Sequence, residues 1–278
     1  MSTISIITIN YNNLSGLEKT FSSVFSQSNK SFEYVVIDGG SSDGSVAFLA
    51  NHKEHIDYWV SEPDQGIYHA MNKGIKAATG DFVMFVNSGD LFFDSHQIEI
   101  LSQELRQEDG IVYGDVRIVN EKTGFDAIQV HPSVVTFKYF YNQTICHQAC
   151  IIKKALFESV FYFNESFKIV ADWEFLIVAI FVNQVNYRKI DHTISVFDST
   201  GISSNSKYRA IAKQERLQVM DEYFGLFKPD YQELMTHSSL RSQQLVLIQK
   251  SKFLRSIVSI LFFVLLLFVN KKKNYTYD

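Results

Sequence analysis

The segment Tyr34-Val-Val-Ile-Asp-Gly-Gly-Ser-Ser-Asp-Gly44 decides which fold this chain of 278 residues can adopt. Its apolar, β-branched beginning is typical of a strand buried on both faces, and the glycine-rich part after Asp38 predicts a loop. Similar patterns predict strands at 4–9, 56–60 and 82–86 and helices at 14–25 and 67–78. Strands that alternate with helices form βαβ units. We therefore expect an α/β fold with an open, mostly parallel sheet flanked by helices.

The second half of the chain is less regular. Its patterns predict one or two strands in 111–119, a turn at 120–124, a helix at 172–181, strands at 187–190 and 193–197, and a helix at 207–224. We expect one globular domain, residues 1–228, with halves at 1–90 and 91–228. A helical tail, residues 229–278, follows it.

Composition narrows the function classes. The net charge is −4, so nothing indicates a nucleic-acid partner. Cys146 and Cys150 offer no disulfide framework, which favours a reducing compartment, and the N-terminus has no secretion-signal pattern. A zinc site made by these cysteines with His131 and His147 is a weak alternative, because the Cys-x-x-x-Cys spacing lacks a partner pair.

Polar residues follow each expected strand of the first half. Asn10, Asp38, Asp64 and Asp90 all come at or just after strand ends. A single aspartate there is usually a helix cap or a turn former. Four successive strand ends, however, converge on one edge of a parallel sheet, which is where ligands bind. We therefore expect a binding site at this edge, in which Tyr11 could stack on a flat ring.

The sequence lacks two common phosphate-binding motifs. No Gly-x-Gly-x-x-Gly follows the first strand and no P-loop lysine motif is present, which argues against a dehydrogenase or a P-loop kinase. Asp90 suits Mg²⁺ or Mn²⁺, because such ions take carboxylate and phosphate oxygens together. Lys73 could add positive charge or could be a solvated helix lysine, and the residues leave both possibilities open.

Five motifs together carry a resemblance to glycosyltransferase family 2, of the GT-A fold. They are Val36-Ile-Asp-Gly-Gly-Ser-Ser-Asp-Gly44, Ser61-Glu-Pro-Asp-Gln-Gly-Ile-Tyr68, Ala70-Met-Asn-Lys-Gly74, Thr79-Gly-Asp81 and Asn87-Ser-Gly-Asp90. The similarity covers roughly residues 3 to 220 and is closest to the WcaE-like and WfgS-like enzymes of colanic-acid and O-antigen assembly. An ordered string of motifs is more specific than any single one.

The resemblance implies roles for particular residues. Tyr11, Asp38 and Asp64 would contact the nucleoside, and Asp90, the last residue of the family's Asp-x-Asp-like motif, would bind the metal on the diphosphate. Because Asn87 begins the motif here, the Mg²⁺ or Mn²⁺ would have one protein carboxylate and would bind weakly without nucleotide. We expect a donor site in residues 1–90 that includes Thr8, Asn10, Tyr11, Asp38, Gly39, Asp64, Gly66, Asn72, Lys73, Ser88, Gly89 and Asp90.

The second half, 91–228, would hold the acceptor and the catalytic base. In Val170-Ala-Asp-Trp-Glu174, local pattern alone favours Asp172 as a helix cap and Glu174 on a solvated first turn. The resemblance instead implies that Asp172 is the base, with Glu174 in reserve. His147 and Gln148 match a His-Gln pair of the resembled group, and we expect them and Trp173 to line the pocket.

The tail contains an apolar segment, residues 253–270. Residues 257–269 include only one polar side chain, Ser259, and lysines or arginine flank the segment on both sides. Thirteen helical residues extend about 20 Å, which is short of the ~30 Å hydrocarbon core of a bilayer. A buried helix, a span and partial insertion all remain possible. We favour association with the cytoplasmic face of a bacterial inner membrane, since lysines suit its anionic surface.

The predicted function is that of an inverting, metal-dependent glycosyltransferase of bacterial surface polysaccharide (O-antigen, capsule or exopolysaccharide). It would move a sugar from a nucleotide-diphosphate donor, with UDP the expected carrier, to a polyprenyl-diphosphate-linked saccharide. One alternative is a sugar-1-phosphate nucleotidyltransferase, but residues 10–16 are not its glycine-rich basic loop. Another is a nucleotide-sugar-binding protein without catalysis, against which the presence of both Asp90 and Asp172 counts.

Overall fold

A computed structural model describes residues 3–201, 206–231, 244–245, 247–248 and 250–268 of the chain. The chain divides into two compact units, Met1–Val219 and Met220–Asp278. The first unit contains the sheet and the candidate site, and the second contains the apolar part of the tail.

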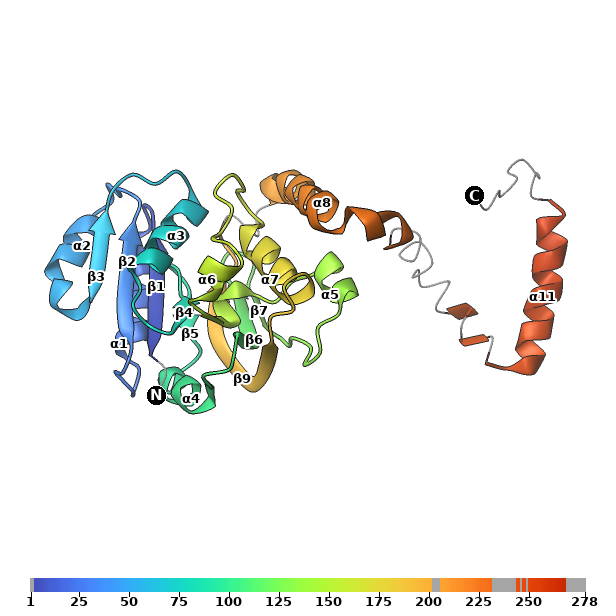
Figure 1. The fold of residues 1–278 in the computed structure, drawn as a ribbon, viewed down its shortest axis with the longest axis horizontal. Helices are drawn as coiled ribbons and strands as arrows, with labels where there is room; N and C mark the ends of the chain where they lie inside the picture. Colours follow the sequence, from blue (N-terminus) through green and yellow to red (C-terminus); the bar gives the residue numbers. More distant parts are fainter. Residues whose placement is uncertain (1–2, 202–205, 232–243, 246, 249, 269–278) are drawn as a thin grey trace. The chain divides into compact units, whose positions relative to one another are not determined.

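The first unit is built on a mixed sheet, seen in Figure 1, in which most paired residues belong to parallel strands. The strand order is β3-β2-β1-β4-β8-β6-β9-β5, and β7 pairs with β6. The strands are β1 (Ile4–Asn10), β2 (Glu33–Asp38), β3 (Tyr58–Ser61), β4 (Phe82–Phe85), β5 (Leu91–Phe92), β6 (Ile111–Asn120), β7 (Phe125–Gln129), β8 (Cys150–Lys153) and β9 (Tyr187–Asp198).

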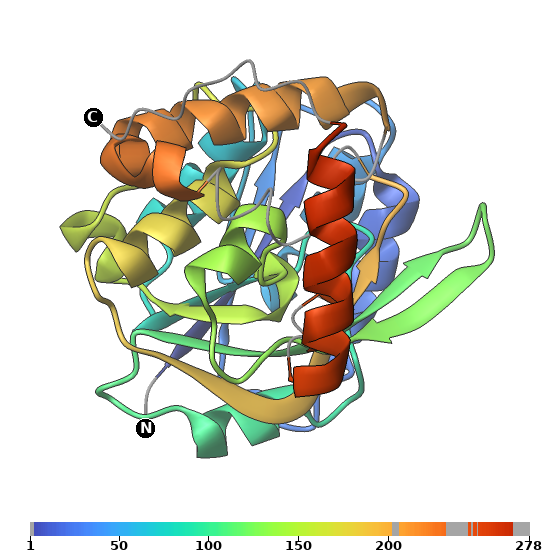
Figure 2. The same ribbon diagram turned by 90° about the vertical axis from the view of Figure 1, so that its right-hand side faces the viewer.

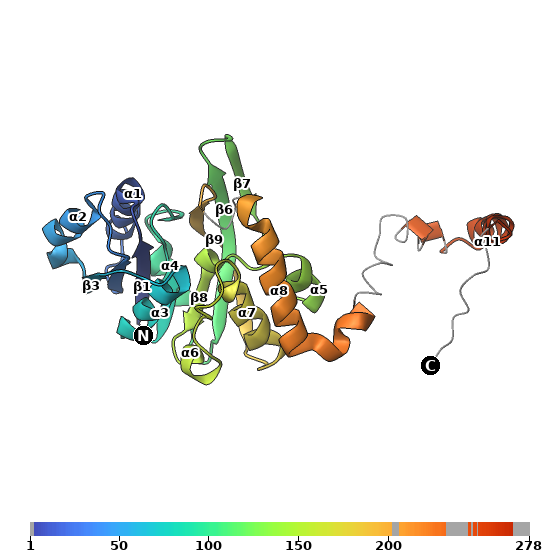
Figure 3. The same ribbon diagram turned by 90° about the horizontal axis from the view of Figure 1, so that it is seen from above.

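Helices cover both faces of the sheet, as Figure 3 shows for α1 and α3 on opposite sides of β1 and β2. Alternate β1 side chains account for this. Ile4 and Ile6 join the core cluster beneath α1, whereas Ile7 faces α3, where a Cβ added to Gly74 would lie 2.4 Å from it. The helices are α1 (Leu14–Phe25), α2 (Ser45–Asn51), α3 (Ile67–Ala77), α4 (Gln97–Glu104), α5 (Phe137–Asn142), α6 (Leu156–Ser159), α7 (Ala171–Phe181) and α8 (Arg209–Phe224).

The expected α/β fold with a largely parallel sheet is confirmed, with local differences. Residues 187–197 form the single strand β9 rather than two strands, because the pairing with β6 continues through an irregular register. The turn at 120–124 does close a hairpin, β6–β7, which Figure 2 shows projecting beyond the sheet. Strand β8 was not predicted, although it pairs with both β4 and β6 and so joins the two halves of the sheet. Short 3-10 turns occupy Lys53–His55, His147–Ala149, Ser206–Tyr208 and Gly225–Phe227.

The second unit contains α11 (Lys252–Leu266), a helix of 15 residues capped by the side chain of Ser251. Its apolar side chains are exposed. At about 1.5 Å per residue it extends roughly 22 Å. Over the described residues of the chain, no helix is long and apolar enough to cross a membrane. The last two residues of the predicted segment 253–270, and the lysines after it, lie outside the described residues.

Candidate active site

The carboxyl ends of four parallel strands meet at one edge of the sheet. β3, β2, β1 and β4 are neighbours in that order. Their register places Asn10 beside Asp38 and Asp38 beside Ser61. The polar strand ends that the sequence predicts to converge are therefore adjacent in space.

Asp38 organises this edge. Its side chain is fully buried and accepts hydrogen bonds from the Ser41 backbone N–H (2.9 Å) and hydroxyl (2.6 Å), from the Ser61 hydroxyl (2.6 Å) and from Asn10 Nδ2 (2.7 Å). Burial alone would raise the Asp38 pKa, but these donors outweigh it and the pKa lies below its usual value. The carboxylate therefore fixes the loop 39–44, and a nucleoside would meet a site that is already ordered.

Asp64 presents an acceptor with no partner. Its Oδ1 pairs with Lys73 Nζ (2.6 Å) and contacts His69 Nδ1 (3.0 Å). Its Oδ2 is buried and has no hydrogen-bond partner within the described part of the chain. Gly39 leaves room beside it, since an added Cβ would lie 3.3 Å from this oxygen and 3.1 Å from the ring of Tyr11. Tyr11 is 67% exposed. An acceptor next to an exposed ring suits a flat base with an N–H group.

Lys73 is an ion-paired residue rather than a solvated helix lysine. Its Nζ lies 2.8 Å from Glu62 Oε1 and 2.6 Å from Asp64 Oδ1. Burial would lower the Lys73 pKa, but the hydrogen bonds and charges of the two carboxylates raise it. The positive charge is therefore held at the edge where Asp64 lies.

The other expected donor residues divide into two groups. Thr8 and Asn72 are buried and engaged inside the protein, Thr8 with the Val86 carbonyl (2.7 Å) and Asn72 with the backbone of Phe163 (2.8 and 3.0 Å). The remaining members lie in the strand-end loops. Among them, the Ser88 hydroxyl donates to Asn10 (2.8 Å), and Gly66 and Gly89 have φ of 137° and 107°. Those φ values favour glycine at both positions.

Asp90 is a buried carboxylate in a polar setting. Its Oδ1 accepts the backbone N–H of Asp198 (3.1 Å), and the Gln148 side chain also hydrogen-bonds to it. Burial, reinforced by the negative charge of Asp198, raises the Asp90 pKa to about 7 despite the opposing effect of His147. Asp198 ends β9, and its place beside Asp90 was not expected from the sequence. Two neighbouring carboxylates of this kind are stabilised by a cation.

The residues present fit a divalent ion that keeps water and phosphate ligands. Asn87 Oδ1 is buried without a hydrogen-bond partner among the residues described. Asp90 and this amide oxygen are hard ligands of the type that Mg²⁺ and Mn²⁺ prefer. In the described ranges no group of three or more His, Cys, Asp or Glu side chains could hold a metal ion. An ion here would therefore take phosphate or water oxygens as its remaining ligands.

Asp172 lies beside this edge and does not cap its helix. It is the second residue of α7, whose N-cap is Val170 with no side-chain cap bond. Its Oδ1 accepts from the Tyr68 hydroxyl (3.0 Å) and its Oδ2 contacts His147 Nδ1 (2.8 Å), and 17% of its side chain is exposed. The capping interpretation is therefore wrong, because tertiary contacts engage both oxygens. Glu174 is buried, so the solvated first turn expected from local pattern is wrong as well.

Asp172 and His147 each shift the pKa of the other. Burial works against ionisation of Asp172, but the hydrogen bond and charge of His147, followed by the Tyr68 hydroxyl, lower the Asp172 pKa. Burial likewise lowers the His147 pKa, but its hydrogen bond and charge interaction with Asp172 outweigh this and raise it. The Asp172 carboxylate is therefore ionised in the folded protein at neutral pH.

The turn that carries His147 and Gln148 connects the two carboxylates. Gln148 hydrogen-bonds to Asp90, and His147 contacts both Asp172 and Asn87 Nδ2 (3.3 Å). The sequence did not single out Tyr68 or Asn87 as partners of these groups, although both stand in the motifs quoted above. Asp198 has no such local signal, because only the pairing of β9 places it there.

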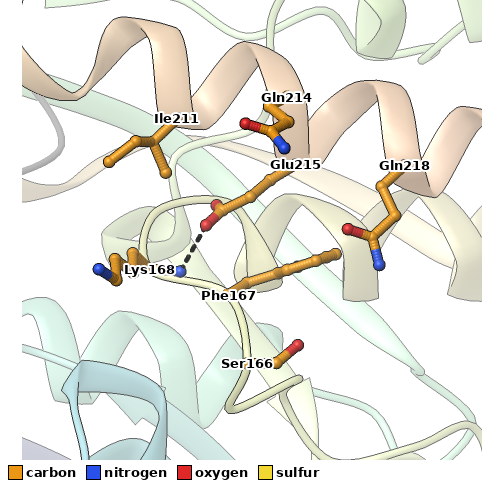
Figure 4. A pocket seen from close by; sticks show the side chains of 7 residues that line it. All are labelled: Ser166, Phe167, Lys168, Ile211, Gln214, Glu215 and Gln218. Atoms are coloured by element: carbon orange, nitrogen blue, oxygen red, sulfur yellow. Dashed lines mark hydrogen bonds between the residues drawn. The ribbon is translucent and has the colours of Figure 1, made fainter.

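Helix α8 is fastened to the loop before α7, as Figure 4 shows. The Glu215 carboxylate accepts the backbone N–H groups of Lys168 (2.7 Å) and Ile169 (3.1 Å). Arg216 stacks 4.7 Å above the ring of Trp173, which is buried and donates its indole N–H to the Phe140 carbonyl (2.8 Å). α8 thus holds the segment from which Asp172 projects. An open hollow of about 400 Å³ beside it is lined by Ser166, Phe167, Lys168, Ile211, Gln214, Glu215 and Gln218.

Both cysteines are free thiols; Cys150 is buried and Cys146 is half-buried. Cys146 Sγ donates to Gln148 Oε1 (2.8 Å) and Cys150 Sγ to the Cys146 carbonyl (3.3 Å). Burial raises the pKa of both thiols. His131 contacts the backbone through both ring nitrogens, at Gly114 O (2.7 Å) and Cys146 N (3.2 Å). These contacts give each group a structural role.

Comparison with known proteins places this geometry in context. Residues 5–161 match the family model described as glycosyl transferase family 2. An uncharacterised glycosyltransferase of Mycobacterium tuberculosis is 35% identical over 217 residues, covering 75% of this chain and 80% of that protein. A PGL/p-HBAD biosynthesis glycosyltransferase of M. tuberculosis is 30% identical over 181 residues, covering 62% of this chain and 67% of that protein.

Solved structures share the fold. S. aureus TarS 1-349 in complex with UDP-GlcNAc aligns with a TM-score of 0.61 at 18% identity, covering 79% of this chain and 67% of that one. The mannosyltransferase PcManGT from Pyrobaculum calidifontis, in complex with GDP-Man and Mn²⁺, aligns with a TM-score of 0.55 at 16% identity, covering 92% and 83%. At identities of 18% and 16%, these similarities show that the chains share a fold.

Proposed function

We propose a reaction for this chain from the premise that it belongs to glycosyltransferase family 2, an inverting family that uses nucleotide-sugar donors. The chain transfers a sugar from a nucleoside diphosphate to a hydroxyl of a lipid-linked saccharide. The observation that carries the proposal is the joining of Asp90 and Asp172 in one cluster through Gln148 and His147. The departing diphosphate can therefore be neutralised near Asp90 while Asp172, in the same cluster, deprotonates the acceptor hydroxyl.

The donor binds at the strand-end edge. The partnerless Asp64 Oδ2, next to Gly39 and Tyr11, accepts an N–H of the base. UDP is the proposed carrier, because the N3–H of uracil offers one donor on a flat ring that Tyr11 can cover. Solved relatives in fold bind UDP-GlcNAc or GDP-Man, so a donor panel needs both bases.

The diphosphate lies toward Asp90. Bound there, Mg²⁺ or Mn²⁺ would neutralise the charge that develops on the departing diphosphate. Asp90 and Asn87 Oδ1 are the proposed protein ligands, with the rest of the coordination sphere from phosphate and water. Asp198 adds negative charge beside Asp90.

Asp172 is the proposed general base. It takes the proton of the acceptor hydroxyl as that oxygen attacks the anomeric carbon from the face opposite the diphosphate. The new C–O bond forms as the bond to the diphosphate breaks, and the electron pair leaves with the diphosphate. The configuration at the anomeric carbon inverts. Glu174, two residues further along α7, is buried and stays in reserve as the base.

One experiment separates this function from its alternatives. Purified protein is screened by thermal shift with UDP-glucose, UDP-N-acetylglucosamine, UDP-galactose and GDP-mannose, with and without Mn²⁺, since a bound ligand raises Tm by mass action. Asp172→Asn should keep the Tm shift and lose transfer by about a thousandfold or more, a range typical of removing a general base. Transfer by this variant at the wild-type rate contradicts the assignment. Binding without turnover in the wild type would favour a non-catalytic protein. Release of pyrophosphate from UTP mixed with glucose 1-phosphate would favour a nucleotidyltransferase.

The acceptor is proposed to be membrane-borne. The resemblance to the WcaE-like and WfgS-like group favours a polyprenyl-diphosphate-linked saccharide of a bacterial surface polysaccharide. A relative that is 30% identical is named for PGL/p-HBAD biosynthesis, so a second class of glycolipid acceptor belongs in the assays.

Association with the cytoplasmic face of the inner membrane is proposed through the tail. Helix α11 exposes apolar side chains on all sides and begins beside Lys250 and Lys252. Such a helix suits an interface with anionic lipid. Deleting residues 251–278 should move the protein from the membrane fraction to the soluble fraction. A full-length protein that is already soluble contradicts this proposal without affecting the reaction.

A further inference from the structure

His147 touches both halves of the candidate active site. Its Nδ1 lies 2.8 Å from Asp172 Oδ2, and its Nε2 lies 3.3 Å from Asn87 Nδ2. The second Asp172 oxygen accepts the Tyr68 hydroxyl. The imidazole is 21% exposed and the Asp172 side chain is 17% exposed, so solvent reaches part of the pair. The ring therefore stands between the proposed base and the residue that begins the Asn87-Ser-Gly-Asp90 motif.

These two contacts select one form of the imidazole. An ionised carboxylate can only accept, so Nδ1 must carry a hydrogen. An amide NH₂ can only donate, so Nε2 must offer its lone pair to Asn87. Asp172 raises the His147 pKa, and above that pKa both contacts are satisfied together by one neutral tautomer, protonated at Nδ1.

The identity of residue 87 matters for this arrangement. An ionised aspartate at this position could only accept, so it could not donate to Nε2. Asn87 can, and its own Oδ1 has no other hydrogen-bond partner in the described residues. The amide is therefore oriented through Nδ2. Asn87 and His147 form a matched pair in this chain.

We propose that His147 is a positioning residue, whose Nδ1–H holds the Asp172 carboxylate in the orientation that accepts the acceptor's proton, while Asn87 holds His147 in the required tautomer. This rests on the function proposed above. In the step itself the acceptor O–H bond breaks and its proton goes to Asp172. Both His147 hydrogen bonds remain, and His147 neither gains nor loses a proton. Its contribution is the fixed geometry, because misplacing a reacting group by about 1 Å can lower the rate roughly 100-fold.

Two nearly isosteric variants separate the two contacts. In His147→Asn the amide nitrogen takes the place of Nδ1, which keeps the bond to Asp172 and loses Asn87. In His147→Gln the amide reaches the place of Nε2, which keeps Asn87 and loses Asp172. Transfer is followed as nucleotide release from the donor panel, with a synthetic polyprenyl-diphosphate-linked N-acetylglucosamine as acceptor. We expect kcat to fall less than about 10-fold in His147→Asn and about 100-fold in His147→Gln. The Tm shift with UDP should stay unchanged in both.

Two patterns of activity would overturn the proposal. Near wild-type kcat in both variants would mean that the contact with Asp172 is only structural. Equal loss in both, with activity of His147→Gly restored by free imidazole, would mean that His147 itself takes the proton. A wild type that binds UDP and transfers nothing would instead count against the proposed function.

A measurement without turnover tests the tautomer directly. In protein labelled with ¹⁵N-histidine, the His147 signals are identified by their loss in His147→Asn. At pH 9 we expect Nδ1 to be protonated and Nε2 to be bare, and Asn87→Ala should shift the ring toward the other tautomer. A proton on Nε2 in the wild type would overturn the proposal, whatever the enzyme transfers.

Discussion

Replacing Gly39 with alanine tests whether the donor base sits between Tyr11 and Asp64. The new Cβ would lie 3.1 Å from the Tyr11 ring and 3.3 Å from Asp64 Oδ2. Both distances are a few tenths of an ångström tighter than ordinary contacts, and Tyr11, at 67% exposed, can move aside. Gly39 does not have positive φ, so alanine is compatible with its backbone. The fold should therefore lose less than about 1 kcal/mol.

Binding of UDP should suffer much more. The methyl group would occupy the place where the base reaches Asp64 Oδ2, an oxygen with no partner in the described structure. Losing a hydrogen bond to a charged group costs about 1.5–3 kcal/mol. Each 1.4 kcal/mol is a factor of ten in Kd. We therefore expect UDP to bind about 10- to 100-fold more weakly.

Isothermal titration calorimetry with UDP measures this difference, and thermal unfolding checks the fold. Gly225→Ala is the matched control, because a Cβ there meets nothing within 4 Å. Wild-type affinity in Gly39→Ala would refute the placement of the base. A large drop in Tm for Gly39→Ala, without UDP present, would refute the reasoning about Tyr11.

Three further predictions concern the frame of the site. Asp38→Asn should destabilise the protein by about 2–3 kcal/mol at pH 7. The amide NH₂ of the variant would face the Ser41 N–H or hydroxyl, which are themselves buried donors. The pKa of Asp38 is lower in the folded protein than in the unfolded chain. Its contribution to the free energy of unfolding is therefore complete above the unfolded pKa of about 3.9 and is lost as the pH falls through the folded pKa. Urea unfolding should show the stability difference between wild type and variant shrinking below about pH 4, and a constant difference would contradict this. In Glu215→Gln, one of the two backbone N–H groups loses its carboxylate acceptor. Hydrogen exchange of the Lys168 or Ile169 amide should therefore become about tenfold faster, as expected for the loss of a hydrogen bond of about 1.4 kcal/mol. Unchanged exchange would mean that α8 does not hold the loop. Chelation of divalent cations should abolish transfer and added Mn²⁺ should restore it, and full activity in excess chelator would remove the metal from the proposal.

The first half of the fold was predictable because its signals are local. Each buried strand is an apolar run, and each helix between strands repeats at helical spacing. Parallel neighbours then bring their ends together by geometry alone. β8 escaped prediction because its short apolar run, Cys150–Lys153, lies in the less regular half of the chain, without clear helical patterns on both sides to mark it as a strand. Its existence depends on pairing with β4 and β6, which no local window contains.

The strand-end motifs and the family can therefore be read from the sequence, since both are written in contiguous residues. The roles of the acidic residues at this edge depend on the folded chain. Asp172 looks like a helix cap when read along the chain, but it bonds to Tyr68 and His147, which are 104 and 25 residues away. Asp90 meets Asp198, which is 108 residues away. Local pattern fixes backbone conformation, whereas the partner of a buried charge is set by whichever distant groups packing brings within hydrogen-bond distance.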